Sequence, residues 1–302
     1  MEREISQKTN SGTTKEHTAG LLRSSKKWVR NAVTIGTLMA INSFFVPQRA
    51  SPAEAAGMTR EASEEAEVLN RYNIRSGKTV EPLVSKNWAG YIATVNQPII
   101  SGVKAEWTVP EIRKGKEGAG LVQWVGIGSA KSGDQMQLVT EEIIDKGNAS
   151  YYAAIDLQPD YVVKLVGFPL KPLDQVEAKI LLFPGTNNKW LLQITNLTQK
   201  IEIQRVHTYD SSRLWGEFIG VEATQLNHSS YQELADFKEI SIRNCVVTID
   251  NKPITINMLP NTAVVMVDRK SHLRYTPVRM RTDTTSFTIV PTAFSDGDLG
   301  TN

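Results

Sequence analysis

Short β-rich segments follow one another from Trp88 almost to the C-terminus of this 302-residue chain. Each is rich in β-branched and aromatic residues and is bounded by Gly, Pro, Asn or Asp, which is typical of strands separated by turns. Almost no helical pattern lies between them, so the sequence predicts an all-β fold, an antiparallel sandwich or barrel. The expected strands are Trp88–Val95, Ile99–Val109, Leu121–Ile127, Gln135–Ile143, Ser150–Leu157, Tyr161–Val166, Gln175–Phe183, Lys189–Asn196, Ile201–Val206, Glu217–Glu222, Glu239–Ile249, Ile254–Met258, Ala263–Val267 and Ser286–Val290.

The segment Gly120–Ile143 combines an apolar strand, a turn of small residues and a second strand with polar side chains. The apolar part, Leu121–Ile127, suits a strand that is covered on both faces. Side chains alternate along the second strand, so Met136 and Leu138 face one side of the sheet. The opposite side receives Gln135, Gln137, Val139 and Glu141. Such a polar row fits either the solvent-facing side of a half-buried sheet or a functional surface, and the residues alone leave both open.

The N-terminal region has the pattern of a secretory signal peptide. Basic residues around Lys26 precede an apolar run, Ala32–Val46, and a small-residue site at Ala53–Ala55. The run is shorter than the ~20 residues that a membrane-spanning helix needs. Residues 1–56 are therefore expected to be a signal peptide that directs the chain out of the cell, and an uncleaved leader that anchors the protein in a membrane is the alternative.

Residues 57–80 are expected to form a propeptide or a linker helix, because Thr59–Tyr72 is acidic, rich in alanine and typical of a helix. Residues 81–302 then form one β-sandwich domain. We expect a monomer that has no stable membrane insertion after processing.

Charge and cysteine content exclude several classes of protein. Residues 1–55 carry eight Lys and Arg against four Glu, so the remaining chain has a net charge of −2 although the whole chain has +2. A domain without a clustered basic face does not suit nucleic-acid binding. The single cysteine, Cys245, lies in an apolar segment where burial is expected, and an intrachain disulfide is ruled out.

Common catalytic and metal-binding patterns are missing from the sequence. There is no Gly-x-Ser-x-Gly elbow, no His-Glu-x-x-His motif and no Cys/His cluster, and the four histidines are scattered. Cys245 has no neighbouring base that would activate its thiol. The sequence therefore predicts neither a metal nor a cofactor, and an enzyme on this scaffold would use carboxylates and amides.

Three short motifs stand in a specific order and spacing. They are Asn-Trp-Ala-Gly at Asn87–Gly90, Trp-Thr-Val-Pro at Trp107–Pro110 and Trp-Val-Gly-Ile at Trp124–Ile127. Looser motifs follow at Asp134–Gln137, Tyr151–Asp160, Gly216–Glu222 and Ala235–Phe237. From Lys86 to the C-terminus, this series resembles the glutamic peptidases (eqolisins, peptidase family G1).

The resemblance implies a concanavalin-like sandwich of two seven-stranded antiparallel sheets with a substrate groove. It implies an endopeptidase that hydrolyses peptide bonds of polypeptides through a dyad of Gln137 and Glu222, and the leader alone implies that this enzyme is secreted. The carboxylate would take a proton from the attacking water, and the amide would donate to the oxyanion. A free carboxylate is a weak base, so an acid pH range is expected. The substrate-binding positions that the same motifs imply are Trp88, Trp124, Glu141 and Asp156.

The chain departs from the family pattern at several positions. Gly220 is an extra residue, so a β-bulge is predicted there, because one added residue would otherwise turn Glu222 away from the face of Glu217. Gly128 stands where the family has an aspartate. The remaining replacements are Ala154 and Leu157 for two tryptophans, Asp156 for a glutamate and Glu141 for an aspartate. The missing aromatic residues are expected to reshape the groove.

Other interpretations stay open. One is a catalytically weakened or inactive secreted sandwich that binds peptide or glycan. Another is a glycosidase with a facing pair of carboxyl groups, for which Glu141 and Glu222 are the candidates. Glu217 also fits an outward-facing surface carboxylate. A Glu222 that points into the core, away from Gln137, would exclude the dyad.

Overall fold

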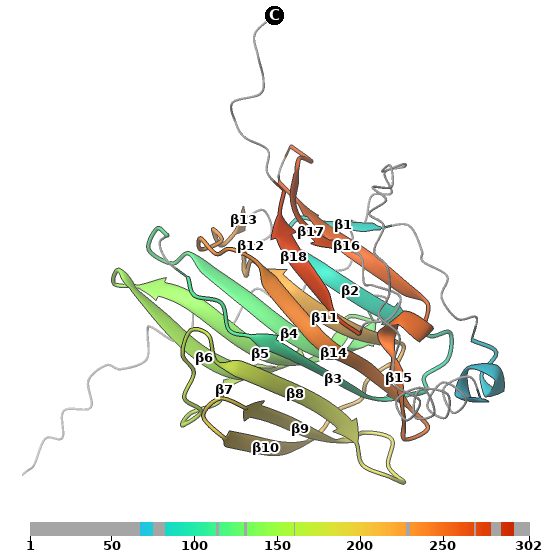
Figure 1. The fold of residues 1–302 in the computed structure, drawn as a ribbon. Helices are drawn as coiled ribbons and strands as arrows, with labels where there is room; N and C mark the ends of the chain where they lie inside the picture. Colours follow the sequence, from blue (N-terminus) through green and yellow to red (C-terminus); the bar gives the residue numbers. More distant parts are fainter. Residues whose placement is uncertain are drawn as a thin grey trace, which may run out of the picture.

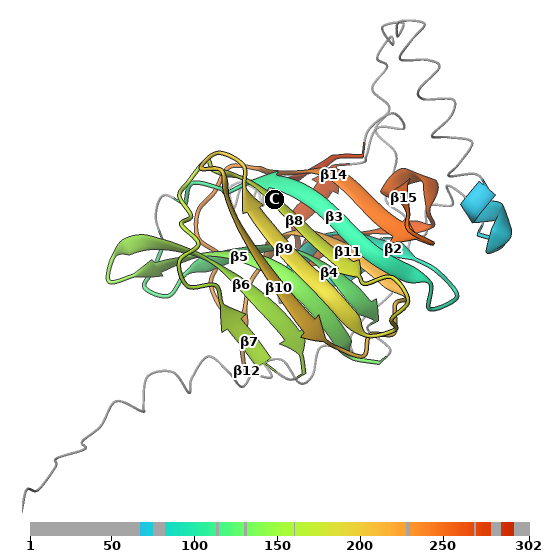
Figure 2. The same cartoon turned by 90° about the horizontal axis from the view of Figure 1, so that it is seen from below.

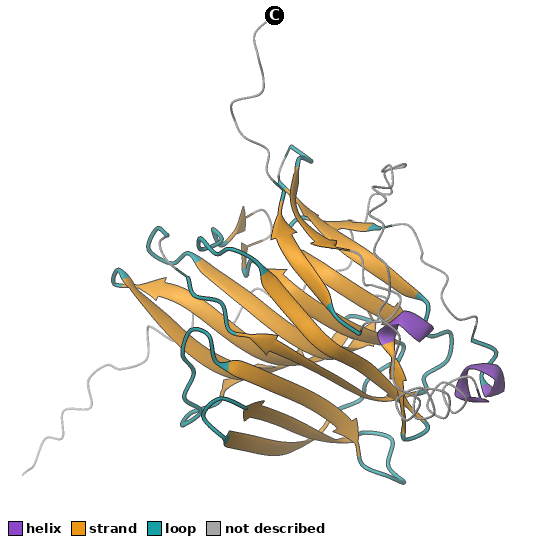
Figure 3. Ribbon diagram, viewed as in Figure 1, coloured by secondary structure: helices purple, strands orange, loops and turns teal. Residues whose placement is uncertain are grey.

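The computed structural model describes residues 67–74, 82–112, 115–129, 132–159, 161–227, 230–268, 270–278 and 285–292. Most of the regular structure in this part of the chain is β-strand, as Figure 3 shows. The strands are β1 (Leu83–Ser85), β2 (Trp88–Thr94), β3 (Ile100–Thr108), β4 (Gly120–Ser129), β5 (Asp134–Asp145), β6 (Asn148–Gln158), β7 (Tyr161–Lys164), β8 (Gln175–Leu182), β9 (Lys189–Asn196), β10 (Ile201–Thr208), β11 (Trp215–Glu222), β12 (Gln225–Asn227), β13 (Ser230–Tyr231), β14 (Ile240–Ile249), β15 (Lys252–Thr255), β16 (Asn261–Val267), β17 (Leu273–Val278) and β18 (Phe287–Pro291). A turn of 3-10 helix, η2 (Ile256–Met258), follows β15.

One hydrogen-bonded sheet of 16 strands contains nearly all of these elements. Its order is β10-β9-β8-β3-β14-β18-β17-β16-β2-β11-β4-β5-β6-β7, with β1 beside β16 and β15 beside β14. The pairs along this path are antiparallel, whereas β1 runs parallel to β16. Strands β12 and β13 form a small separate sheet.

The path folds back on itself, so its two halves lie face to face (Figures 1 and 2). Across the interior, β3 contacts β4 and β11, and β8 contacts β4 and β5, although these strands are not neighbours in the sheet. One layer thus contains β10, β9, β8, β3 and β14, and the other contains β2, β11, β4, β5 and β6. This arrangement confirms the antiparallel β-sandwich that the sequence predicts.

Large apolar side chains fill the space between the layers. Trp107 on β3, Trp190 on β9 and Phe218 on β11 are fully buried and belong to one continuous core, which we call the main core. All ten residues of β4 are buried. Odd-numbered side chains of β4 such as Val125 enter the main core, and even-numbered ones such as Trp124 are covered on the other face. Coverage of this strand on both faces is what its apolar sequence predicts.

Most of the expected strands are confirmed with small differences at their ends. The expectation for Ile254–Met258 is partly wrong, because β15 ends at Thr255 and the chain then turns into η2. The sequence pattern does not reveal β17, in which Pro277 cannot donate a backbone hydrogen bond and so weakens the strand signal. It also misses β1, β12 and β13, which are too short to show a periodic pattern.

A short helix (residues 67–71) lies at the start of the described chain. Val68 and Leu69 are buried in the main core. Arg71 Nη1 donates to Asp250 Oδ2 at 2.9 Å, and the Tyr72 hydroxyl donates to Asp250 Oδ1 at 2.6 Å. The helix is therefore anchored to the turn between β14 and β15.

This anchor bears on the expected N-terminal segments. Part of the propeptide or linker region 57–80 is seated on the sandwich, and the rest of that region lies outside the described residues. The expected signal peptide, residues 1–56, also lies outside them. Within the part of the chain that is described, no helix is long and apolar enough to cross a membrane.

Candidate active site

Strands β2, β11, β4, β5 and β6 carry a set of polar and aromatic side chains on the side that faces away from the main core. We call this surface the dyad face. It is defined by Trp88, Trp124, Gln135, Gln137, Glu141, Asp156, Glu217 and Glu222. In the register, Gln137 on β5 is opposite Gly126 on β4, which is opposite Glu217 on β11. Gly126 has no side chain, and its neighbours cover it, since a Cβ at this position would lie 3.0 Å from Cζ3 of Trp124 and 3.2 Å from Cγ of Gln137.

Glu222 reaches the dyad face through a β-bulge in β11. The register with β2 shifts between Ile219 and Val221, and Val221 is fully buried in the main core. A Cβ on Gly220 would lie 2.7 Å from Cδ1 of Ile289, so this position also faces the core. Two consecutive core-facing residues return Glu222 to the dyad face, and the bulge predicted at Gly220 is confirmed.

Glu222 is partly buried and accepts a hydrogen bond from the indole Nε1 of Trp124. Burial raises the pKa of Glu222 to about 8, and the bond from Trp124 opposes this shift. Three other carboxyl groups act in the same direction as burial, namely those of Asp156, Glu141 and Glu217. With this raised pKa, ionised Glu222 is a stronger base than an ordinary carboxylate.

Glu217 is fully buried and is held by a single amide. Gln135 Nε2 donates to Glu217 Oε1 at 3.0 Å and to Oε2 at 2.9 Å. Gln137 Nε2 in turn donates to Gln135 Oε1 at 3.3 Å. Burial raises the pKa of Glu217 to about 8, although the bonds from Gln135 oppose the shift. Glu217 faces away from the main core, but its interpretation as a surface carboxylate is wrong, because its side chain has no exposed area.

An apolar wall stands beside this polar row. It is a small cluster, separate from the main core, of Val122, Trp124, Val139, Ala154 and Ile219. Trp88 packs against the cluster, and its ring centroid lies 6.4 Å from that of Trp124. Both tryptophans thus lie on the dyad face, where the resemblance implies a substrate-binding role.

Asp156 and Glu141 complete the polar surface. Gln158 Nε2 donates to Asp156 Oδ2 at 3.2 Å, and burial raises the pKa of Asp156 to about 6. Glu141 accepts a hydrogen bond from the Tyr152 hydroxyl, and burial raises the pKa of Glu141 as well. Both carboxyl groups therefore bind their protons more tightly than they would in water.

Most of the site residues predicted from the sequence lie in two rows across the sheet, and Trp124 lies between these rows, opposite Val139 and Ile219. One row consists of Asp156, Gln137, Gly126 and Glu217, and the other of Glu141, Val122, Glu222 and Trp88. Gln137 and Glu222 lie in different rows, opposite Gly126 and Val122 of β4, and among the described side chains no hydrogen bond joins them directly. Within the same residues, no group of three or more His, Cys, Asp and Glu is arranged to hold a metal ion.

The departures from the family pattern have different structural outcomes. A Cβ on Gly128 would lie 2.1 Å from the backbone oxygen of Asp134, so this position has no room for an aspartate. Ala154 lies in the apolar wall, where a larger aromatic ring would change the surface. Leu157 is 1% exposed and belongs to the main core. The expectation that Leu157 reshapes the groove is therefore wrong.

The sequence places Gln135 on the dyad face but does not predict that it has a role in the site. Strand alternation assigns it to the side of Gln137. Its contact with Glu217 spans 82 positions in the chain and arises because β4 lies between β5 and β11. The sequence pattern indicates where the strands lie in the chain but not their order in the sheet, so it cannot predict this contact.

Comparison with known proteins supports a peptidase. The model of the Peptidase A4 family matches residues 86–289. A crystal structure of scytalido-glutamic peptidase with a peptide-based transition-state analogue is similar, with a TM-score of 0.57 and 17% identity over 69% of this chain and 99% of that chain. SCP-B, an eqolisin in complex with the tripeptide Ala-Ile-His, has a TM-score of 0.53 and 16% identity over 69% of this chain and 99% of its own. No curated protein sequence matches the chain.

The two kinds of match carry different information. The structural neighbours share little sequence with this chain and show its fold. The family match extends over more than half of the chain and includes every residue of the dyad face. The chain belongs to the Peptidase A4 family, the eqolisin family G1, and is a peptidase.

Proposed function

We propose that this peptidase cleaves peptide bonds with Glu222 as the proton-transferring base and Gln137 as the oxyanion donor. The observation that carries the proposal is that both side chains lie on the dyad face, which Glu222 reaches through the bulge at Gly220. The Trp124 indole donates to Glu222 and fixes the direction of its carboxyl group. An amide and a base with a raised pKa are the two groups that hydrolysis by water requires.

In the proposed reaction, a water lies between Glu222 and the scissile carbonyl group. Glu222 accepts a proton as the water oxygen attacks the carbonyl carbon, and Gln137 Nε2 donates to the carbonyl oxygen as that oxygen becomes negative. The tetrahedral intermediate then breaks its C–N bond, and Glu222 gives the proton to the leaving nitrogen. One oxyanion donor of this kind typically contributes about 10²–10³-fold in rate.

The proposed pH range follows from the raised pKa of Glu222. A base must be ionised to accept a proton, so the rate is expected to rise with pH towards the pKa of about 8. The acid range expected from the sequence assumes an ordinary carboxyl pKa of about 4.3. We therefore propose activity that extends to near-neutral pH.

The proposed substrate is an extended stretch of polypeptide in an unfolded or flexible protein. Its apolar side chains would contact the wall that contains Trp88 and Trp124, and its backbone would pass between Gln137 and Glu222. Asp156 and Glu141 border this path and would restrict which polar side chains fit. The catalytic domain is residues 81–302 as a monomer, secreted after removal of the signal peptide within residues 1–56.

Digestion of a denatured protein across acid to neutral pH tests the proposal. The full chain is compared with Gln137→Ala and Glu222→Gln, and a metal chelator and a serine-protease inhibitor serve as controls. We expect cleavage by the parent that neither reagent affects and that both substitutions remove. Full activity in either variant would show that the reaction does not depend on this dyad.

A non-catalytic module that binds peptide is the second candidate. The lack of space for a side chain at Gly128 and the small Ala154 in the apolar wall favour it, because the family pattern has larger groups at both positions. A folded parent that binds the denatured protein without cleaving it at any pH would support this function. The glycosidase interpretation finds no support in the family to which the chain belongs.

A further inference from the structure

We propose that Gln135 is a positioning residue, which fixes the orientation of the Gln137 amide by linking it to the buried carboxyl group of Glu217. The proposal rests on the function proposed for Gln137. It assigns a role to a side chain outside the dyad.

The two ends of the Gln135 amide have different partners. Its Nε2 donates to both oxygens of Glu217, at 3.0 and 2.9 Å, and its Oε1 accepts from Gln137 Nε2 at 3.3 Å. When Glu217 is ionised, both of its oxygens can only accept, and they select the nitrogen end of the Gln135 amide. The oxygen end is then left to face Gln137.

The orientation of the Gln135 amide in turn determines the orientation of the Gln137 amide. An isolated glutamine amide rotates through a broad, roughly two-fold range, so its nitrogen and oxygen exchange places readily. With Gln135 Oε1 beside it, the Gln137 amide is held with its nitrogen as the bonded end, and the second hydrogen of Nε2 remains for a carbonyl oxygen. A reversed Gln137 would present its own oxygen to the developing oxyanion and would repel it.

Two glycines make the link between Gln135 and Glu217 possible. The partners lie on β5 and β11, two strand spacings or about 10 Å apart across β4. In the register, Gly128 is opposite Gln135 and Gly126 is opposite both Gln137 and Glu217. Neither glycine carries a side chain on the dyad face, so the Gln135 amide crosses β4 without obstruction. The Gly-x-Gly pattern of β4 thus has a structural purpose, which is to let side chains of its two neighbours meet.

The backbone of Gln135 is also fixed from the side. Its carbonyl oxygen lies 3.1 Å from the Tyr209 hydroxyl and shares the single proton of that hydroxyl with the carbonyl oxygen of Gln158. Glu217, the other end of the link, is fully buried. The link therefore connects Gln137 to rigid parts of the sheet on both sides.

The test replaces Gln135 by methionine, which keeps the length of the side chain and removes all three of its hydrogen bonds. The matched control is Gln204→Met, since Gln204 on β10 also donates to a glutamate, Glu202 Oε1, at 2.7 Å but lies far from the dyad face. We expect Gln135→Met to lower kcat by about 10–100-fold with KM changed by less than about twofold, because the donor is misaligned while the binding surface is intact. Gln204→Met should keep the parent values.

A second measurement does not depend on activity. The side-chain amide resonances of Gln137 are identified in the NMR spectrum by their loss in Gln137→Ala. Gln135→Met should shift them, and Gln204→Met should not. Unchanged Gln137 resonances together with an unchanged kcat in Gln135→Met would overturn the proposal. If the parent cleaves no substrate, the proposed function fails, and the Gln137 resonances alone then decide whether Gln135 orients this amide.

Discussion

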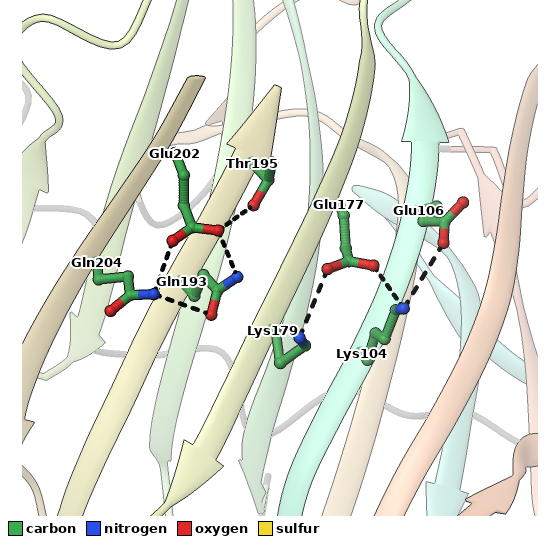
Figure 4. A network of polar contacts seen from close by, with 8 residues as sticks. All are labelled: Lys104, Glu106, Glu177, Lys179, Gln193, Thr195, Glu202 and Gln204. Atoms are coloured by element: carbon green, nitrogen blue, oxygen red, sulfur yellow. Dashed lines mark hydrogen bonds and ion pairs between the residues drawn. The ribbon is translucent and has the colours of Figure 1, made fainter. Parts of the chain in front are cut away.

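The sandwich carries two rows of glutamine and glutamate side chains, one on each of its outer faces. The first is the dyad face. The second, which we call the ladder face, lies on β10, β9, β8 and β3 and is shown in Figure 4. Its residues are Lys104, Glu106, Glu177, Lys179, Gln193, Thr195, Glu202 and Gln204. On both faces a glutamine amide donates to a glutamate on another strand, at 2.9 and 3.0 Å for Gln135 and 2.8 Å for Gln193.

The two faces differ in solvent exposure and in positive charge. On the ladder face Lys104 Nζ lies 2.5 Å from Glu177, and these side chains are 34% and 16% exposed. On the dyad face Glu217 is fully buried, and within the described residues neither it nor Glu222 has a Lys or Arg in hydrogen-bond or ion-pair contact. Burial without a compensating cation raises the pKa of both carboxyl groups. The same residue types thus become candidate acid–base groups on one face and a solvated surface on the other.

The strongest test of this comparison makes the same substitution on both faces. Glu222→Gln is expected to reduce kcat/KM by about 10²–10⁴-fold, the range for loss of a general acid–base group. Glu202→Gln, on the ladder face, should leave kcat/KM within about twofold of the parent, since it is remote from the dyad. Initial rates on a fluorogenic peptide give both values. If kcat/KM fell equally in both variants, the loss would come from reduced stability of the protein and not from the removal of a catalytic group.

The next test uses pH and stability. The pKa of Glu217 is raised in the folded state to about 8, so the folded protein holds a proton that the unfolded chain releases near its ordinary pKa. Its contribution to the free energy of unfolding is complete below about pH 4.3 and declines as pH rises to about 8, by a few kcal/mol. Glu217→Gln should reduce this decline, and Glu177→Gln on the ladder face should not. Urea unfolding at about pH 5 and about pH 9 measures it. If the free energy of unfolding fell by the same amount between these pH values in the parent and in Glu217→Gln, burial of Glu217 would not be the cause of the decline.

A smaller effect is expected from deleting Gly220. The deletion removes the bulge and makes the ladder of β11 regular, so Glu222 stays on the dyad face with the spacing of an ordinary strand. We expect kcat/KM within about tenfold of the parent. Inserting one alanine after Gly220 adds another residue to the strand and should turn Glu222 towards the core. An active insertion variant would disprove this account of the bulge.

The smallest effect is expected on the ladder face itself. Lys104→Met removes the contacts of Lys104 with Glu177 and Glu106 at 2.5 and 3.7 Å. Because these groups are partly exposed, the free energy of unfolding should fall by only about 0.2–1 kcal/mol, and less at high salt. Peptidase activity should be unchanged. Denaturant unfolding at low and high salt tests this prediction. If the free energy of unfolding fell by several kcal/mol, the ladder face would not be the weakly stabilising, solvated surface described above.

Local patterns in the sequence predict much of the fold and the side of the sheet on which each residue lies. Alternation along β5 separates Met136 from Gln137, and counting residues in β11 predicts the bulge that returns Glu222 to the face of Gln137. Both predictions need only the period of a strand and one extra residue.

Contacts between distant strands cannot be predicted in this way. The bonds from Gln135 to Glu217 depend on the order β5-β4-β11, which alternation within one strand does not determine. The family pattern predicts that Leu157 affects the substrate groove, although its neighbour Asp156 occupies that face and the next side chain along the strand must point into the core. The burial that raises the pKa of Glu217 likewise comes from strands assembled around it.

The contact between the first helix and Asp250 has a consequence for how the protein is made. Tyr72 and Asp250 are 178 positions apart, so the helix leaves the ribosome long before the turn that will hold it exists. Until β14 and its turn are complete, Val68 and Leu69 have no finished interior to enter. Contacts over such long loops close late and slow the search for the native state. The earliest described residues of the chain can therefore reach their places only after β14 and the turn at Asp250 have been synthesised.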